Sequence, residues 1–121
     1  MEKIKNFKDL KIWQKGIEIV KDVYEVTASF PREELFSLTA QVRRSAISIP
    51  SNIAEGFKRY HSKEYSQFLR IALGSAAELE TQLIIAKELG LIKEREEFFG
   101  GIVEKLDHLS KMISSLLNKL K

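Results

Sequence analysis

The sequence predicts an all-α fold, an up-down-up-down antiparallel four-helix bundle in which residues 1–121 form a single domain. Apolar residues recur at intervals of three and four along four long segments, which is the spacing of one helix face. No alternation of apolar and polar residues runs far enough to indicate a β-sheet. Only two prolines and six glycines interrupt the chain. Short connectors between helices of roughly 20–28 residues favour antiparallel neighbours.

The first helix is expected over residues 9–28. Its helical spacing predicts a buried stripe of Leu10, Trp13, Ile17, Val20 and Tyr24. The helix should end before Phe30, because Pro31 disfavours helical backbone at the residue that precedes it. The segment SFPREEL is then a connector, and Ser37 is a candidate cap for the next helix.

The second helix is expected over residues 38–58. Its apolar stripe is Leu38, Val42, Ala46, Ile49, Ile53 and Phe57. Pro50 falls inside this segment, where a proline removes one backbone hydrogen bond and costs ~3 kcal/mol in a regular helix. Because the helical period continues on both sides of Pro50, the sequence predicts a kink rather than an end.

The third helix is expected over residues 63–89, with Ser62 as its cap and Gly90 as the residue that ends it. Its predicted buried stripe is Tyr65, Phe68, Leu69, Ala72, Ala76, Leu79, Leu83 and Ala86. Several small residues between Ala72 and Ala77 would let a neighbouring helix approach closely.

The fourth helix is expected over residues 93–120. Its predicted stripe is Phe98, Ile102, Leu106, Leu109, Ile113, Leu116 and Leu120. Gly100 and Gly101 weaken its first half, by about 1 kcal/mol each relative to alanine.

The second helix also carries a polar edge, which is its most informative feature. An ordinary solvated face is richer in Lys and Glu, whereas Ser and Asn are poor helix formers unless their side chains have partners. The edge is therefore expected to meet something more specific than bulk water. Its residues, three or four positions apart, are Gln41, Arg44, Ser48, Asn52, Glu55 and Arg59.

The third helix offers partners for this polar edge. In an antiparallel hairpin that turns near residues 60–62, Arg44 is expected opposite Glu78, Gln41 near Gln82, and Arg70 near Glu55. Three interpretations follow: an internal polar network that fixes the helix register, a subunit interface, or a surface that contacts a ligand directly. An oligomer would allow these interpretations to overlap.

Positive charge is gathered in two segments, although the net charge is only +3. Residues 41–75 contain six basic and two acidic residues, and residues 1–15 contain five lysines and two acids. This distribution hints at an anionic partner.

Catalytic and metal-binding patterns are missing from the sequence. There are no cysteines and only two histidines, His61 and His108, in unrelated contexts. The Glu-x-x-His pair of di-iron bundles does not occur. We therefore expect no enzymatic activity, no cofactor and no metal. Because no run of ~20 apolar residues is present, we also expect no membrane span and a soluble, cytoplasmic protein.

Three long runs carry a resemblance to a known family. They are FKDLKIWQKG, FPREELFSLTAQVRRSAISIPSNIAEGFKRY and SQFLRIALGSAAELETQLIIAKELGLI. They resemble the four-helix bundle family encoded by intervening sequences of bacterial 23S ribosomal RNA genes. The family motif falls on the polar edge and its predicted partners, at Gln41, Arg44, Ser48, Pro50, Asn52, Glu55, Gly56, Ser75, Glu78 and Gln82.

The resemblance implies a small bacterial protein that assembles as a homo-oligomeric ring, typically a pentamer, without enzymatic activity. A related protein is the accessory variability determinant of diversity-generating retroelements. It is a basic pentameric bundle that binds nucleic acid and a reverse transcriptase.

Two functional hypotheses follow. The first is a ring-forming protein that binds RNA or other nucleic acid weakly, with phosphate contacts from Arg43, Lys58, Arg59 and Lys63, while Arg44 and Arg70 are tied to Glu78 and Glu55. The alternative is a protein-interaction scaffold or accessory subunit that docks a partner enzyme, such as a reverse transcriptase. Basic side chains that converge on one exposed face favour the first hypothesis, and basic side chains that scatter or pair internally favour the second.

Overall fold

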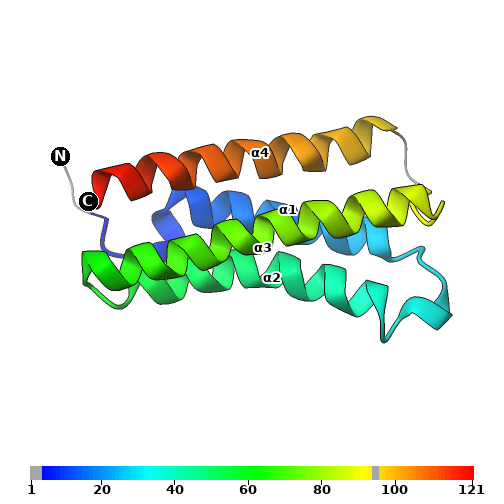
Figure 1. Cartoon of the computed structure of the whole chain (residues 1–121), viewed down its shortest axis with the longest axis horizontal. Coiled ribbons are helices and arrows are strands. Elements are labelled where there is room, and N and C mark those ends of the chain that lie inside the picture. The colour runs from blue at the N-terminus through cyan, green and yellow to red at the C-terminus, as the bar shows by residue number, and fades with distance from the viewer. Residues whose placement is uncertain (1–3, 94–95) are drawn as a thin grey trace.

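The computed structural model describes residues 4–93 and 96–121, and every regular element in these residues is helical. A short 3-10 helix, η1 (Phe7–Asp9), precedes α1, and a second, η2 (Arg32–Glu34), lies in the connector after it. The four long helices pack as a bundle (Figure 1), which confirms the predicted all-α fold class. Their bounds are α1 Lys11–Thr27, α2 Leu38–Phe57, α3 Ser62–Glu88 and α4 Glu96–Lys119.

The two ends of the bundle hold different connections (Figure 1). The start of α1, the turn between α2 and α3 and the end of α4 lie at one end. The connector from α1 to α2 and the end of α3 lie at the other. Residues distant in sequence therefore meet at each end.

The helix ends lie within three residues of the predicted positions, but only one of the predicted caps is present. Gly90 adopts a φ of 75°, and its N–H and that of Leu91 bond to the carbonyls of Lys87 and Ala86, so it ends α3 as predicted. Ser37 precedes α2 but makes no side-chain cap bond, because its hydroxyl bonds to Glu34 instead. The remaining predicted cap residue, at the start of α3, is the first helical residue rather than the cap.

Helix α2 continues through Pro50 without interruption. The Pro50 ring faces α1 at Gly16, where a Cβ atom added to the glycine would lie 3.2 Å from the Pro50 Cβ. Pro50 is buried against this glycine, so the contact between α1 and α2 is close at that level.

The core is formed by the predicted stripes of α2, α3 and α4, whereas the stripe of α1 is displaced by about one residue. α1 buries Ile12, Ile19, Val23 and Val26, while the predicted Tyr24 is 40% exposed. Two adjacent apolar rows run along α1, and the structure buries the row of Ile12, Ile19, Val23 and Val26 more deeply than the predicted one.

The seam between α2 and α3 is the most extensive helix–helix contact in the described part of the bundle. At Gly56 a Cβ atom would lie only 2.7 Å from the Phe68 Cβ, so no larger residue fits without movement. At mid-seam, the hydroxyls of Ser48 and Ser75 hydrogen-bond at 2.8 Å. Small residues thus let two backbones approach and let polar side chains pair between them.

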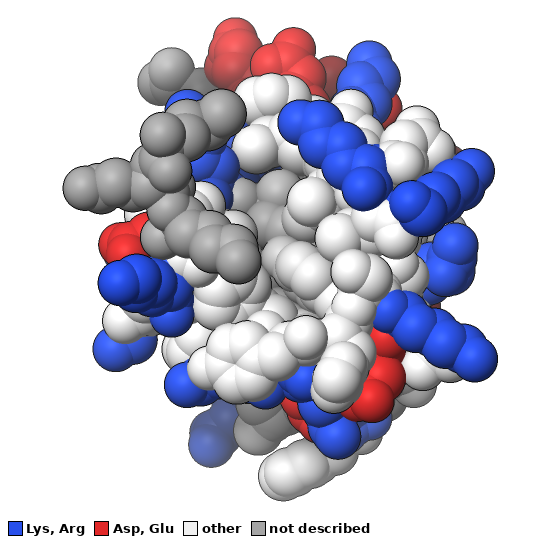
Figure 2. All heavy atoms as spheres, turned by 90° about the vertical axis from the view of Figure 1, so that its left-hand side faces the viewer, with Lys and Arg blue, Asp and Glu red and all other residues white. Residues whose placement is uncertain are grey.

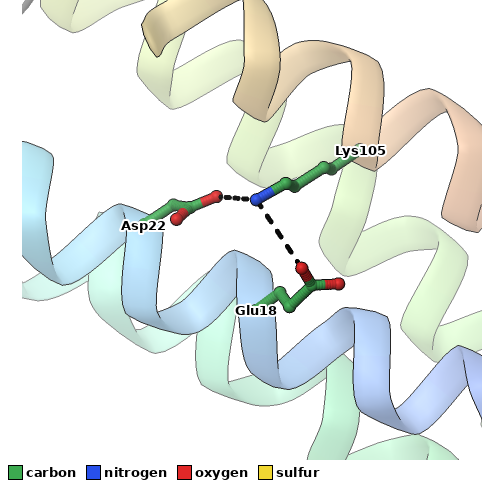
Figure 3. A network of polar contacts seen from close by, with 3 residues as sticks. All are labelled: Glu18, Asp22 and Lys105. Carbon is green, nitrogen blue, oxygen red and sulfur yellow. Dashed lines mark hydrogen bonds and ion pairs between the residues drawn. The ribbon is translucent and has the colours of Figure 1, made fainter.

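The seam between α1 and α4 is held by a charged cluster at its surface (Figure 3). The Lys105 Nζ on α4 lies 2.7 Å from the Asp22 Oδ2 and 3.9 Å from the Glu18 Oε1, both on α1. The hydrogen bond to Asp22 raises the pKa of Lys105, and its partial burial opposes this shift. The α1–α4 seam is therefore bridged by the long, charged side chain of Lys105, whereas the α2–α3 seam is bridged by short side chains such as Ser48 and Ser75.

Candidate nucleic-acid interface

The turn between α2 and α3 places an aromatic side chain at one end of the bundle. Tyr60 adopts a left-handed φ of 62°, which is uncommon for a residue with a Cβ, and its side chain is 73% exposed. The backbone N–H groups of Lys58 and Arg59 bond to carbonyls of the last turn of α2 and so fix the path of the turn. Tyr60 is thus presented to solvent by a well-bonded turn.

A pocket of about 530 Å³ lies beside this turn. Its wall combines apolar, aromatic and basic groups from α2, α3 and the segment before α1. The lining residues are Ile4, Lys5, Phe57, Tyr60, His61, Ser62 and Tyr65. The Phe57 and Tyr65 rings meet edge to face with their centroids 6.1 Å apart, so two walls of the pocket are packed against each other.

Tyr65 is anchored in the core rather than free in this pocket. Its hydroxyl is shielded from solvent and has no hydrogen-bond partner among the described residues. Burial raises the pKa of Tyr65 to about 12. The phenol therefore stays neutral at any physiological pH, and its role here is to support Phe57 and the turn.

Basic side chains surround an uncharged centre at this end of the molecule (Figure 2). Lys5, Lys58 and Lys63 are exposed, and none of the three forms an ion pair within the described ranges. Arg59 differs, because its Nη2 lies 3.0 Å from the Glu55 Oε2 and its guanidinium lies 5.0 Å from the Phe68 ring centroid. Lys5 lines the pocket, and Lys58 and Lys63 lie next to its lining residues in sequence, so these three cations are available to an anionic ligand there.

Arg43, the fourth residue predicted to contact phosphates, lies far along α2 from this end. Its Nε donates a 2.8 Å hydrogen bond to the Thr27 Oγ1, and its guanidinium lies 4.5 Å from the Tyr24 ring centroid. The structure therefore brings Lys58, Arg59 and Lys63 together but holds Arg43 against the end of α1.

The polar edge of α2 forms a second pocket with α3, of about 290 Å³. Its lining residues are Gln41, Arg44, Ser45, Ser48, Glu78 and Gln82. Below them, the Asn52 Nδ2 donates to the Ser48 Oγ at 2.9 Å and to the Ser48 carbonyl at 2.8 Å. The edge is thus partly an internal network and partly an open polar surface.

The predicted pairing of Arg44 with Glu78 is wrong. Glu78 accepts a 3.0 Å hydrogen bond from the buried Ser45 hydroxyl, and no ion pair joins it to Arg44, although both line the same pocket. Ser45 pairs with Glu78 at the level predicted for Arg44, and it lies about 100° around α2 from Arg44, on the side that faces α3. Arg44 consequently stays exposed on the surface while Ser45 faces α3.

The predicted ion pair of Arg70 with Glu55 is also wrong. Glu55 instead pairs with Arg59, four residues later in the sequence. The sequence predicts Gln82 near Gln41, and the two do line the same pocket. Gln82 is only 9% exposed, and its Oε1 has no hydrogen-bond partner among the described residues.

Several residues of these sites are not predicted from the sequence, among them Tyr60, Ser45 and Lys5. Ser45 lies beside the apolar stripe of α2, and the apolar spacing alone does not indicate that its hydroxyl faces Glu78. Lys5 lies outside the regular helices, so no periodic pattern could assign it to the pocket near Tyr60.

Neither a metal site nor a membrane span is found in the described part of the chain. Within residues 4–93 and 96–121, no three His, Asp or Glu side chains gather in a way that could hold a metal ion. None of the helices in those ranges combines the length and apolarity needed to cross a bilayer.

Comparisons with known proteins place this geometry in context. The chain matches the family described as 23S rRNA-intervening sequence protein over residues 8–115. It is similar to the crystal structure of a protein of unknown function from the S23 ribosomal protein family of Bacteroides thetaiotaomicron, with a TM-score of 0.78 and 23% sequence identity. That similarity covers 88% of this chain and 95% of the other, and it bears on the fold alone. No curated protein sequence matches the chain.

Proposed function

The chain belongs to the family of 23S rRNA-intervening sequence proteins, and on this premise we propose that it is a non-enzymatic, homo-oligomeric protein that binds RNA weakly through the end of the bundle that carries Tyr60. The family's description ties its genes to ribosomal RNA, but the proposal depends on the chemistry of this end. A chain with exposed lysines around an aromatic centre can hold a phosphate backbone and stack on an unpaired base.

The observation that carries the proposal is the placement of Tyr60. A tyrosine that is 73% exposed, in a left-handed conformation, costs stability and removes little apolar surface from water. The same side chain lines a pocket with Lys5 and lies two residues from Lys58 and three from Lys63, so it is well placed to stack on a base while the lysines contact the flanking phosphates.

The expected affinity is modest, since the proposed phosphate contacts come from only three lysines, Lys5, Lys58 and Lys63. Arg59 is already paired with Glu55. Each phosphate contact contributes a slope of about −0.7 to −0.9 to the dependence of log K on log salt concentration. Binding should therefore be detectable at low salt and weak at physiological salt, unless several subunits present their ends together.

Assembly into a ring is the second part of the proposal, and the resemblance to pentameric relatives suggests five subunits. Several large apolar side chains of the monomer are exposed, among them Phe36, Ile71 and Ile84. Contiguous exposed apolar surface is typical of interaction sites. A ring would also multiply the weak contacts of each basic end.

The binding proposal is tested by fluorescence anisotropy with a structured ribosomal RNA fragment and a single-stranded oligonucleotide, titrated at ~50 mM salt and then at rising salt. Tyr60→Ala should weaken binding of the single strand by about 1–3 kcal/mol. The double variant Lys58→Ala/Lys63→Ala should make the salt dependence shallower by roughly two contacts. Lys21→Ala, an exposed lysine midway along α1, is the matched control and should bind like the native chain.

Two results would contradict the binding proposal. One is the absence of any anisotropy change with micromolar protein at low salt. The other is equal binding by the native chain, Tyr60→Ala and the double lysine variant. Either result would leave the protein-interaction scaffold as the surviving hypothesis for this bundle.

A further inference from the structure

The outward face of α3 is unusually poor in charge for a helix of a lone bundle. From Ile71 to Ala86 the helix contains no Lys or Arg, and its two acids are Glu78 and Glu80. Ile71 is 50% exposed, and Ile84 and Ile85 are each 45% exposed. A solvated helix face ordinarily carries charged residues, so this face is suited to being covered.

Gly74 lies in the middle of this face and has no role within the chain. A Cβ atom placed on Gly74 would meet nothing within 4 Å, so no neighbouring group in the bundle requires a glycine there. Glycine in a helix interior costs about 1 kcal/mol relative to alanine. A second backbone that approaches at this point would explain the residue, as Phe68 explains Gly56 at the inner seam.

A second apolar surface lies on another edge of the bundle, where α1 and α2 meet their connector. It forms a groove of about 500 Å³ whose wall includes Tyr24, Leu35, Phe36 and Ile47, and Phe36 is 92% exposed. The charged residues that line this groove are Arg43 and Arg44, and no acid lines it.

We infer that the outward face of α3 of one copy packs into this groove of a second copy. The two surfaces match in chemistry, since each exposes isoleucine or aromatic side chains, and their charges are opposite. The acids of α3, including Glu78, would meet Arg43 and Arg44 of the neighbour. The inference rests on the proposed homo-oligomeric state and assigns the surfaces that form it.

This pairing also fixes the symmetry of the assembly. Because the two surfaces are different and lie on different edges, each copy that uses its groove still has a free α3 face. Such head-to-tail contacts form a ring when the rotation between copies closes, and an open filament when it does not, whereas a face that paired with itself would stop at a dimer. The polar pocket at Arg44 and Glu78 lies between the two surfaces and would sit at the rim of each contact.

The absence of cysteine from the sequence permits a direct test. One copy carries Ala40→Cys in the groove, a second carries Thr81→Cys on the outward face of α3, and the two are co-expressed. Because each chain then holds a single thiol, a short bismaleimide can only join different copies. The control pairs Ala40→Cys with Ser114→Cys, an exposed position on α4.

We expect a covalent dimer on a denaturing gel from the mixed Ala40→Cys and Thr81→Cys copies, and none from either variant alone or from the control pair. Dimers of Thr81→Cys alone would mean that α3 faces itself, and would overturn the inference. If no mixed dimer forms while light scattering still finds an oligomer, the assigned surfaces are wrong and the homo-oligomeric state stands. A monomer in light scattering would refute both.

Discussion

The α2–α3 pair and the α1–α4 pair differ more in their outward surfaces than in their buried stripes. On α4 the exposed positions include Glu104, Asp107, His108 and Lys111, which is ordinary for a solvated helix. On α3 the exposed positions between residues 71 and 85 are almost all apolar or small. The inner seams differ in the same way, with short side chains between α2 and α3 and a long lysine bridge between α1 and α4. The difference indicates that α2 and α3 are suited to close approach on both of their sides.

The largest effect is expected at the inner seam. Gly56→Ala places a Cβ 2.7 Å from the Phe68 Cβ, so α2 and α3 must separate or Phe68 must shift. We expect a loss of about 1–3 kcal/mol in the free energy of unfolding, measured by urea denaturation. Gly101→Ala on α4, where a Cβ meets nothing within 4 Å, serves as the control. Equal stability of the two variants would contradict the close packing of this seam.

The outer side of the same helix pair is probed by Gly74→Ala. Within one chain this change should stabilise α3 by about 1 kcal/mol, because a Cβ there meets nothing. In the assembly the added methyl group should crowd the neighbouring copy and raise the dissociation constant measured by sedimentation equilibrium. Gly100→Ala on α4 should give the local stabilisation without weakening assembly. If both variants assemble equally well, no backbone approaches Gly74.

Tyr65, at the end of the α2–α3 seam, should make the free energy of unfolding depend on pH in the alkaline range. The folded pKa of Tyr65 is raised to about 12 from the ordinary 10.0, so the neutral phenol is favoured in the folded chain. Its contribution to stability is complete below pH 10 and is lost as the pH rises toward 12. Tyr65→Phe should remove this part of the alkaline unfolding transition, followed by circular dichroism. It should also stabilise the chain at neutral pH by about 1 kcal/mol, since the hydroxyl has no partner among the described residues.

An unchanged alkaline transition in Tyr65→Phe would contradict the burial of this hydroxyl. Tyr60→Phe is the matched control, because that side chain is largely exposed.

The smallest effect is expected at the seam of α1 and α4. Lys105→Met removes the ion pairs with Asp22 and Glu18 at a partly exposed site, so the loss of stability should stay below about 1 kcal/mol. The pKa of Lys105 is raised in the folded chain, so its contribution is present below its ordinary pKa near 10.5 and declines above it. The difference between Lys105→Met and the native chain should therefore shrink at high pH. A difference that grows with pH would rule out these ion pairs as its source.

The sequence predicts the architecture well because apolar spacing alone determines which face of a long helix is buried. It places the stripes of α2, α3 and α4 correctly, and Gly90 ends α3 as its freedom at positive φ predicts. The stripe of α1 is displaced because α1 carries two adjacent apolar rows, and helical spacing alone does not indicate which of the two is central.

The candidate sites are less predictable, because side-chain pairs depend on register to a single residue. Ser45, the residue after Arg44, is the hydrogen-bond partner of Glu78, so a hydroxyl–carboxyl hydrogen bond stands where an ion pair was expected. Lys5 lies near Tyr60 because the irregular segment before α1 runs beside the α2–α3 turn. Local sequence preferences do not predict the path of such a segment.

The mass of the protein in solution, measured by light scattering coupled to gel filtration, decides whether this chain is a protomer whose α2–α3 side is covered by other copies. We predict several times the chain mass of 13.9 kDa for the native protein and for Ser114→Arg on α4, and the chain mass alone for Thr81→Arg on α3. A native monomer, or a Thr81→Arg variant that keeps the full native mass, would show that other copies do not cover this side.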